Sequence, residues 1–263
     1  MTLRRRPRVI PVLLVRGEGL VKGRGFAEPQ YVGDPVNAIR IFNEKEVDEI
    51  IVLDILASSE NRPPRFELAR DVASECFMPI CFGGGVATIE HMDRLFAAGV
   101  EKVSINTGST DAALIQAASA RFGSQSVVAA MDVRSGWFGR RKVVVKRGTR
   151  AVHDDPVAWA KRMRDLGAGE ILLQSIDRDG AMAGYDLELV QSVAAAVDIP
   201  VIALGGAGSV ADLRNGLTAG AAAVAAGSMF VFHGRHRAVL ITYPTAAELD
   251  SLIPVPTPTL DGN

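Results

Sequence analysis

The sequence predicts an α/β fold, namely a single (β/α)8 TIM barrel built from two duplicated half-barrels. One observation is an internal repeat, because a shift of 121 positions brings Pro79 onto Pro200 and Gly84-Gly85 onto Gly205-Gly206. The other is the alternation of short β-branched runs with amphipathic segments of helix length, four times in each half. Eight such βα units in about 250 residues match the size of this barrel.

Eight apolar runs account for the barrel strands in chain order. They are residues 9–15, 50–54, 80–82, 102–105, 127–132, 171–175, 201–204 and 223–226. Each run is continuous rather than alternating, as expected for parallel strands that are buried on both faces. We therefore assign residues 1–250 to one barrel domain, and we expect residues 251–263, which are rich in Pro and Thr, to form a disordered tail.

Two connections, residues 16–33 and 133–150, are too long for simple turns. Both follow the C-terminal ends of predicted strands, where barrel enzymes have their active-site loops. The duplication relates the two connections to each other. They are interpreted either as lids over a site or as tolerated insertions.

Composition narrows the range of partners. The chain has 263 residues, 48% of them hydrophobic, and a formal net charge of -1, so it can bury a full core and has no electrostatic reason to bind nucleic acid or an anionic membrane. Small molecules and proteins are the expected partners. Two cysteines, with no signal peptide and no span of 18 apolar residues, indicate the cytoplasm. The four histidines show no metal-ligand spacing, and we expect neither a metal nor a cofactor.

Glycine-rich turns follow the third and the seventh predicted strands. Glycines allow the backbone N–H groups to approach an anion, and a following helix N-terminus adds further donors. The candidate phosphate-binding residues, including polar ends of neighbouring strands, are Gly84, Gly85, Asn106, Thr107, Gly180, Gly205, Gly206, Gly227 and Ser228. The two groups face each other across the mouth of a closed ring, so a substrate with a phosphate at each end would span them. The alternative is that these glycines only relieve tight βα turns.

Asp132 ends the fifth predicted strand, and a carboxylate there is expensive to bury without hydrogen bonds or a function. We interpret it as a catalytic general acid or base, with a helix N-cap or a loop brace as the alternatives. The duplicated segment places Leu14 at the matching position, so a carboxylate pair on opposite strands lacks one member.

Polar residues also end the second and sixth strands, at Asp54 and Gln174. Beyond the sixth strand, Asp177, Arg178 and Asp179 are expected either to orient a substrate or to brace their own loop.

Charged residues stand at the starts of four strands, where a barrel normally has its stabilising face. They are Arg8, Glu49, Lys102 and Glu170. Two cations and two anions on one ring can plug the floor of the barrel as an ion-pair cluster. The sharper hypothesis is a gate that opens to admit a small polar molecule.

Several motifs follow one another along the chain: Leu20-Val21-Lys22-Gly23, Val32-Gly33-Asp34-Pro35, Gly83-Gly84-Gly85, Lys102 to Thr107, Phe122 to Gln125, Gly167 to Leu173, Ser175 to Gly180, and Gly205 to Gly208. Through these motifs, residues 6 to about 240 resemble the HisF family, the cyclase subunit of imidazole glycerol phosphate synthase. The resemblance implies a heterodimer in which a HisH-like glutaminase docks on the floor and releases ammonia. The ammonia enters through the four-charge gate and crosses the barrel interior to the mouth. There a bisphosphorylated ribulosyl substrate is cyclised and cleaved, with Asp132 as one of two catalytic aspartates.

The chain departs from the family pattern at the other aspartate, where Leu14 stands, and at Leu204 and Gln174, which replace a small polar residue and a Thr. Residues 31–46 and 73–79 are similar to a HisF-like branch associated with acetamidino modification of bacterial surface sugars. That similarity implies a second hypothesis, a non-catalytic conduit that passes ammonia to a separate sugar amidotransferase. A third, a sugar isomerase on the same fold, would need paired acid/base residues at positions 14 and 132, and Leu14 argues against it.

Overall fold

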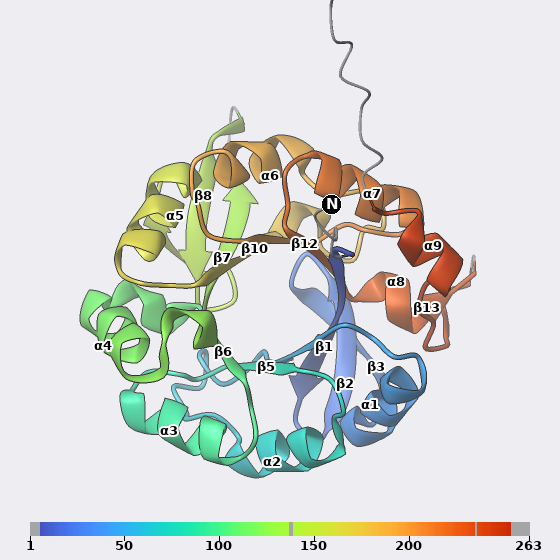
Figure 1. Ribbon diagram of the computed structural model, residues 1–263, viewed down its shortest axis with the longest axis horizontal. Helices are drawn as coiled ribbons and strands as arrows, with labels where there is room; N and C mark the ends of the chain where they lie inside the picture. The colour runs from blue at the N-terminus through green and yellow to red at the C-terminus, as the bar shows by residue number, and fades with distance from the viewer. Residues whose placement is uncertain (1–5, 137–138, 235, 254–263) are drawn as a thin grey trace, which may run out of the picture.

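The computed structural model describes residues 6–136, 139–234 and 236–253. Within these residues, eight parallel strands close a ring: β1 (Arg8–Arg16), β4 (Ile50–Asp54), β5 (Ile80–Gly83), β6 (Lys102–Ile105), β7 (Val127–Ser135), β10 (Glu170–Ser175), β11 (Val201–Leu204) and β12 (Ala223–Ala226). The strands follow one another around the ring in this order, and pairing of β12 with β1 closes it. Figure 1 looks down the axis of this ring. The predicted TIM barrel is confirmed, and all eight predicted strands are present.

Helices cover the outside of the ring (Figure 1). The α-helices in the described ranges are α1 (Pro35–Glu44), α2 (Phe66–Glu75), α3 (Ile89–Ala97), α4 (Ala112–Phe122), α5 (Pro156–Asp165), α6 (Leu187–Ala194), α7 (Val210–Thr218), α8 (Ser228–Val231) and α9 (Ala246–Asp250). Short 3-10 turns lie at η1 (Thr107–Thr110), η2 (Ser124–Ser126) and η4 (Ile176–Arg178).

The helix starts repeat with the same period as the glycine turns. Asp34 caps α1 and Asp155 caps α5, each followed by a proline in the first turn, where a missing N–H costs nothing. Thr88 and Ser209 cap α3 and α7 in the same way, through side-chain oxygens that accept backbone N–H groups. Each pair is 121 positions apart, so the duplication extends to the local signals that begin the helices.

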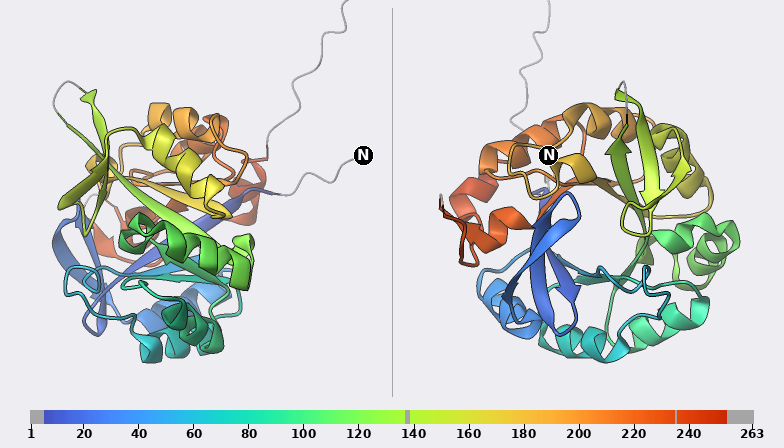
Figure 2. Two further views of the ribbon diagram at one scale, coloured as in Figure 1. Left: turned by 90° about the vertical axis from the view of Figure 1, so that its left-hand side faces the viewer. Right: turned by 180° about the vertical axis from the view of Figure 1, so that it is seen from behind.

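Both long connections fold into antiparallel hairpins. β2 (Gly19–Arg24) pairs with the end of β1 and with β3 (Ala27–Gly33). β8 (Arg141–Val145) pairs with the extension of β7 and with β9 (Arg150–His153). The left view in Figure 2 shows both hairpins projecting from one end of the barrel. A further pair, β13 (Phe232–His233) and β14 (Ala238–Val239), follows α8.

The buried apolar side chains form two clusters. The larger cluster fills the space between the strands and the helices. The smaller one lies inside the ring and includes Ile10, Ile51, Cys81, Val128 and Leu172, with Leu14, Leu53 and Ala130 packed against it. The barrel interior between the two ends is therefore mostly apolar, with the buried hydroxyl of Ser104 on β6 as a polar group at its upper edge.

The first residues of the expected tail, 251–253, are described by the structure, and Leu252 is buried in the larger cluster beside Leu249 of α9. Residues 254–263 of the expected tail lie outside the described residues. None of the helices in the described ranges has the length and the apolar character that crossing a lipid bilayer requires.

Candidate functional site

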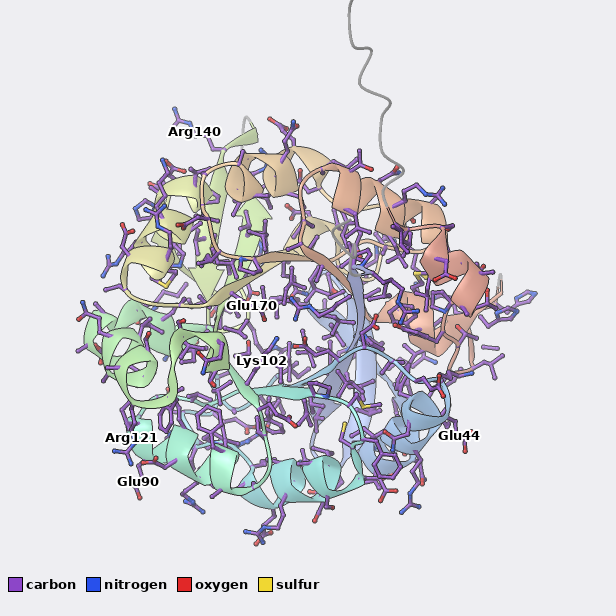
Figure 3. All side chains as sticks on the ribbon, viewed as in Figure 1. Glu44, Glu90, Lys102, Arg121, Arg140 and Glu170 are labelled. Carbon is purple, nitrogen blue, oxygen red and sulfur yellow. The ribbon has the colours of Figure 1, made fainter. Side chains whose placement is uncertain are left out.

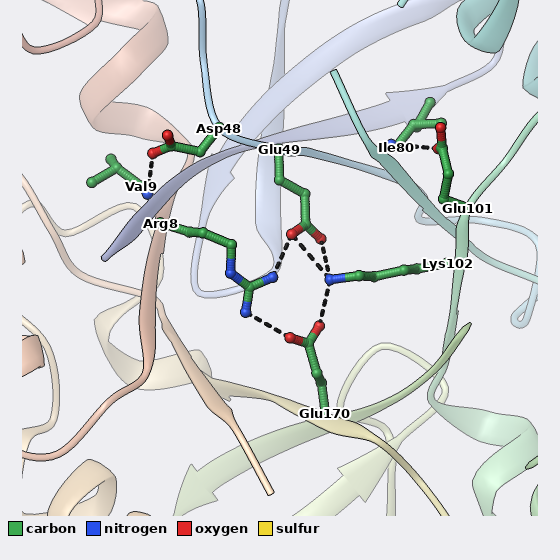
Figure 4. Close-up of polar contacts among 8 residues, drawn as sticks. All are labelled: Arg8, Val9, Asp48, Glu49, Ile80, Glu101, Lys102 and Glu170. Atoms are coloured by element: carbon green, nitrogen blue, oxygen red, sulfur yellow. Dashed lines mark hydrogen bonds and ion pairs between the residues drawn. The ribbon is translucent and has the colours of Figure 1, made fainter. Parts of the chain in front are cut away.

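The four predicted floor residues meet at the barrel axis. Arg8 donates from Nη1 to Glu49 Oε2 at 2.5 Å and from Nη2 to Glu170 Oε1 at 2.6 Å. Lys102 Nζ donates to Glu49 at 3.1 Å and to Glu170 Oε2 at 2.8 Å. Figure 4 shows that these contacts join the four side chains into a closed ring, called the ion ring below. In Figure 3, Lys102 and Glu170 point toward the centre, whereas helix residues such as Glu90 and Arg121 point outward.

The two carboxylates of the ion ring are buried, whereas its two cations are partly exposed. Glu49 and Glu170 are buried, while the Arg8 side chain is 28% exposed. Two positive and two negative groups leave the ring without formal net charge, and each carboxylate is bound by both cations, which offsets its desolvation. Neighbouring strand starts are fixed as well, since Asp48 accepts from Val9 N and Glu101 accepts from Ile80 N (Figure 4).

The opposite end of the barrel contains a cavity of about 120 Å³, called the main cavity below. The first group of candidate phosphate residues lines it: Gly84, Gly85, Asn106 and Thr107. Leu14, Leu53, Ala130 and Leu172, from the inner edge of the barrel interior, also line it, so it adjoins the apolar interior. Gly84 has φ of +113°, and a Cβ there would lie 2.4 Å from Asp54 O, so close packing against β4 also requires this glycine.

The second group of candidate phosphate residues lines a smaller cavity of about 20 Å³: Gly180, Gly205, Gly206, Gly227 and Ser228. Lys22, from the β2 hairpin, is only 6% exposed and lines the same cavity. A Cβ at Gly227 would lie 1.9 Å from Lys22 Nζ, so only glycine leaves room for this side chain. Burial lowers the pKa of Lys22 to about 8, against the opposing influence of Asp179. The two cavities share Leu14, Gln174 and Asp179 on their walls.

Strand register identifies Leu14 as the counterpart of Asp132. Leu14 pairs with Leu53 on β4, and Asp132 pairs with Gln174 on β10. The 121-residue repeat relates Leu53 to Gln174, so their strand partners correspond as well. Asp132 lines the main cavity and is half-buried. Burial, and then the negative charge of Asp179, raises the pKa of Asp132 to about 7. A carboxyl with such a pKa is suited to proton transfer near neutral pH.

The loop after β10 contains two aspartates with different positions: Asp177 fastens the loop, and Asp179 faces the cavities. Asp177 is exposed, and its Oδ2 accepts from Ser135 N at 2.7 Å, which fastens the loop to β7. Asp179 lines both cavities. Asp54, the other polar strand end, forms a two-pronged ion pair with Arg62 at 2.7 and 2.9 Å and therefore braces its own loop.

Sequence reasoning did not select two basic residues at this mouth. Lys22 interrupts the apolar run of β2, and this single cation in a buried strand was the available signal. Arg147 lines the main cavity from the turn between β8 and β9, and its Nη2 donates to Phe26 O at 3.0 Å. That bond joins the tips of the two hairpins over the cavity, a contact that no local pattern predicts.

In the part of the chain that the structure describes, no group of three or more His, Cys, Asp or Glu side chains is arranged to hold a metal ion. The groups that line the mouth include carboxyls, a buried amine, a guanidinium and backbone donors.

Comparison with known proteins identifies the family. Residues 8–237 match the family described as histidine biosynthesis protein. A protein of Pseudomonas aeruginosa named "Putative imidazole glycerol phosphate synthase subunit hisF2" is 56% identical over 247 residues, 93% of this chain and 98% of its own length. The chain belongs to the HisF family. Other HisF relatives include the "Imidazole glycerol phosphate synthase subunit HisF" of Alkaliphilus metalliredigens, 44% identical over 86% of this chain and 90% of its own.

A further HisF relative from Vibrio vulnificus, named "Putative imidazole glycerol phosphate synthase subunit hisF3", is 45% identical over 92% of this chain and 95% of its own length. These matches extend over the ion ring, the barrel interior and both cavities. The HisF resemblance of the sequence motifs is thus confirmed over almost the whole barrel.

Proposed function

We propose that this chain is the ammonia-accepting subunit of a glutamine amidotransferase complex of the imidazole glycerol phosphate synthase type. A HisH-like glutaminase would dock on the barrel floor as the other half of a heterodimer. The ammonia that it releases would pass the ion ring and the barrel interior, and would react at the mouth with a bisphosphorylated ribulosyl substrate. The observation that carries the proposal is the ion ring, which closes one end of an apolar interior while the main cavity adjoins the other.

The barrel interior would admit neutral ammonia and exclude the charged ammonium ion. Its walls are aliphatic side chains with Cys81 and the hydroxyl of Ser104, and among the described interior residues no fixed charge lies between the ion ring and the mouth. An ammonium ion would lose its hydration there without compensation, whereas neutral ammonia carries a far smaller desolvation cost. The ion ring supplies hydrogen-bonding groups at the entrance, and a change of partner by one of its side chains would open a passage.

The mouth fits an anionic substrate with two ends. The main cavity offers Asn106, Thr107 and Arg147 near one glycine turn, and the smaller cavity offers Lys22 and Ser228 near the other. Asp132 lies on the wall of the main cavity, and its raised pKa keeps the carboxyl partly protonated at neutral pH. We assign it the role of general acid.

Product formation without the glutaminase tests the proposal. Imidazole glycerol phosphate is measured with the bisphosphorylated ribulosyl substrate and a saturating ammonium salt at mildly alkaline pH. Turnover is expected, and adding glutaminase and glutamine should replace the need for the salt. Absence of product under both conditions would contradict a cyclase function.

The second candidate is a non-catalytic conduit that supplies a separate amidotransferase acting on surface sugars. It is favoured by Leu14 and Leu204, which place two apolar side chains on the wall of the smaller cavity. Glutamine hydrolysis that is stimulated by this chain, without any turnover of the ribulosyl substrate, would support the conduit.

A further inference from the structure

Three carboxyl groups line the main cavity although the strand position opposite Asp132 holds Leu14. Asp54 is paired with Arg62, which leaves Asp132 and Asp179. Asp132 comes from β7, and Asp179 comes from the loop that follows β10. The two strands are adjacent and in register through Asp132 and Gln174. Asp179 therefore approaches the same space as Asp132 from a neighbouring strand rather than from across the ring.

Asp179 is held in place by groups from β10 and from the β2–β3 turn. Gln174 Nε2 donates to Asp179 Oδ1 at 3.4 Å, and Phe26 N of the β2–β3 turn lies 3.5 Å from Oδ2. The backbone is fixed as well, because Gly25 N donates to Asp179 O at 3.0 Å. Gly180, the next residue, has no room for a Cβ, which would lie 2.2 Å from Gly23 O. The hairpin and the loop thus pack tightly, and they aim the Asp179 carboxyl at the cavity.

We propose that Asp179 takes the place of the carboxyl missing at position 14 and forms a proton-transfer pair with Asp132. This inference rests on the proposed function, because it concerns ammonia that reacts at the same mouth. Gln174 is the positioning residue, since it lies beside Asp132 in the ladder and bonds to Asp179.

The pair accounts for the proton balance when ammonia adds to a carbonyl carbon. One C–N bond forms and the C=O π bond breaks. Asp132, in its acid form, gives its proton to the carbonyl oxygen, and Asp179, as the carboxylate, takes one proton from the nitrogen. The product is a neutral carbinolamine. One proton has moved from Asp132 to Asp179, and its return between the two carboxyls restores the pair.

The surrounding charges favour one proton between the two groups. Like charges in an enclosed site disfavour double ionisation, so each carboxyl raises the cost of ionising the other. The described charged groups around the pair are Lys22 from β2, Asp54 from β4 with its partner Arg62, Arg134 from β7, Arg147 from the β8–β9 turn, and Arg237, whose Nη1 donates to Gly180 O. Burial raises the pKa of Asp179, but Lys22 and the bonds from Phe26 N and Gln174 oppose this rise, whereas only Arg134 opposes it at Asp132. Asp179 is therefore the better carboxylate and Asp132 the better acid.

The first test is Asp179→Asn, assayed with ammonium salt and the ribulosyl substrate. We expect kcat to fall by about 10²- to 10⁴-fold while KM changes little. The alkaline fall of the pH profile should also move to lower pH, because Asp132 loses a negative neighbour. Asp177→Asn is the matched control, since it makes the same change in the same loop at an exposed brace. Retention of kcat within about threefold in Asp179→Asn would overturn the pair.

Rescue separates a chemical role from a structural one. In the background of Asp179→Asn, Leu14→Asp restores a second carboxyl from the opposite side of the mouth, and we expect it to recover at least about tenfold of the lost kcat. Gln174→Ala should reproduce part of the loss, with kcat affected more than KM. A double variant no faster than Asp179→Asn, together with an unaffected Gln174→Ala, would show that Asp179 only braces the loop.

A measurement without turnover distinguishes this inference from the proposed function. If the wild-type chain makes no product at all, the cyclase proposal fails. The pair is then judged by carbon NMR titration of the aspartate carboxyls in the folded chain. The pKa of Asp132 is expected to drop by at least about 0.5 in Asp179→Asn and to stay unchanged in Asp177→Asn. An Asp132 titration that is the same in all three proteins would refute the pair.

Discussion

Replacing Glu170 by alanine removes one of the two anions of the ion ring and should disconnect glutamine hydrolysis from product formation. Glu170 bonds to Arg8 at 2.6 Å and to Lys102 at 2.8 Å. Both cations keep Glu49, so neither is left without a counter-charge. The ring is then open on the side of β10, and ammonia released at the floor is no longer confined to the axis of the barrel.

The cost in stability can be estimated from these contacts. Removing one partner of a buried ion pair costs about 3 to 5 kcal/mol when the other is left unpaired. Here the remaining cations stay paired and are partly exposed, so about 2 kcal/mol is a better figure. For a domain of this size, that lowers Tm by about 4 to 8 °C. The barrel should therefore remain folded at the assay temperature.

The assay compares glutamate released with product formed in the presence of the glutaminase. The wild type is expected to release about one glutamate per product, and Glu170→Ala is expected to release several, since ammonia escapes. Product formation from ammonium salt should be nearly unchanged because the mouth is intact. Glu188→Ala, which loses an exposed ion pair with Arg141, is the control. A ratio that stays at the wild-type value in Glu170→Ala would refute the gate.

Three further changes test other parts of the molecule. Asp132→Asn should raise Tm at pH 8 but not at pH 4, because the folded pKa of Asp132 is raised from 3.8 to about 7, and burial of the carboxylate therefore destabilises the fold only as pH rises through this window. The limit is about 4 kcal/mol, and thermal unfolding at both pH values measures it. Cys81→Trp should fill the barrel interior and lower glutamine-driven turnover more than tenfold, with ammonium-driven turnover and the Cys81→Ala control little affected. Phe77→Ala should weaken glutaminase binding about tenfold in calorimetric titration, because the Phe77 side chain is 87% exposed beside the floor and Asn43 holds its loop in place. The control is Tyr31→Ala, which should bind the glutaminase as the wild type does, since Tyr31 is 66% exposed but lies on β3 at the other end of the barrel.

The fold and the ion ring were predictable because they depend on local and repeated signals. Continuous apolar runs identify parallel strands, and the 121-residue repeat fixes their number. Once the strands are placed, Glu49 and Glu170 fall at equivalent strand starts. Side chains alternate between the two faces of a strand, and Arg8, Glu49 and Glu170 each stand two residues before an interior side chain. They therefore point to the barrel axis, so their meeting with Lys102 follows from the topology.

The contents of the mouth were only partly predictable. Lys22 and Arg147 come from hairpins whose direction over the barrel depends on contacts between distant segments, such as the bond from Arg147 to Phe26 O. Asp179 was recognised as a polar loop residue, but its position beside Asp132 depends on Gln174 and on the β2–β3 turn. A sequence pattern gives the strand on which a side chain starts, and it does not give the distance between two loops.

The glycine turns illustrate a different limit. Gly84, Gly205 and Gly206 would each place a Cβ within 2.6 Å of a neighbouring backbone oxygen. Their presence is therefore required by packing between strands and loops, whether or not an anion binds. What favours a phosphate site is their association with Asn106, Thr107, Lys22 and Ser228 on the cavity walls. The case for a phosphate site therefore rests on these polar neighbours, and the glycines provide the space beside them.

The distribution of charge along the barrel axis favours a neutral molecule as the cargo of the proposed route. The ion ring at the floor is balanced, the interior carries no fixed charge among the described residues, and the mouth combines Asp132 and Asp179 with Lys22 and Arg147. A cation entering from the floor would exchange hydration and the ring carboxylates for mostly aliphatic walls, which is unfavourable by several kcal/mol or more. Under the proposed function, ammonia would cross without that cost and would react only where Asp179 can accept a proton from it. In that proposal, the proton is released at the mouth and not at the entrance, which distinguishes the two ends of the barrel chemically.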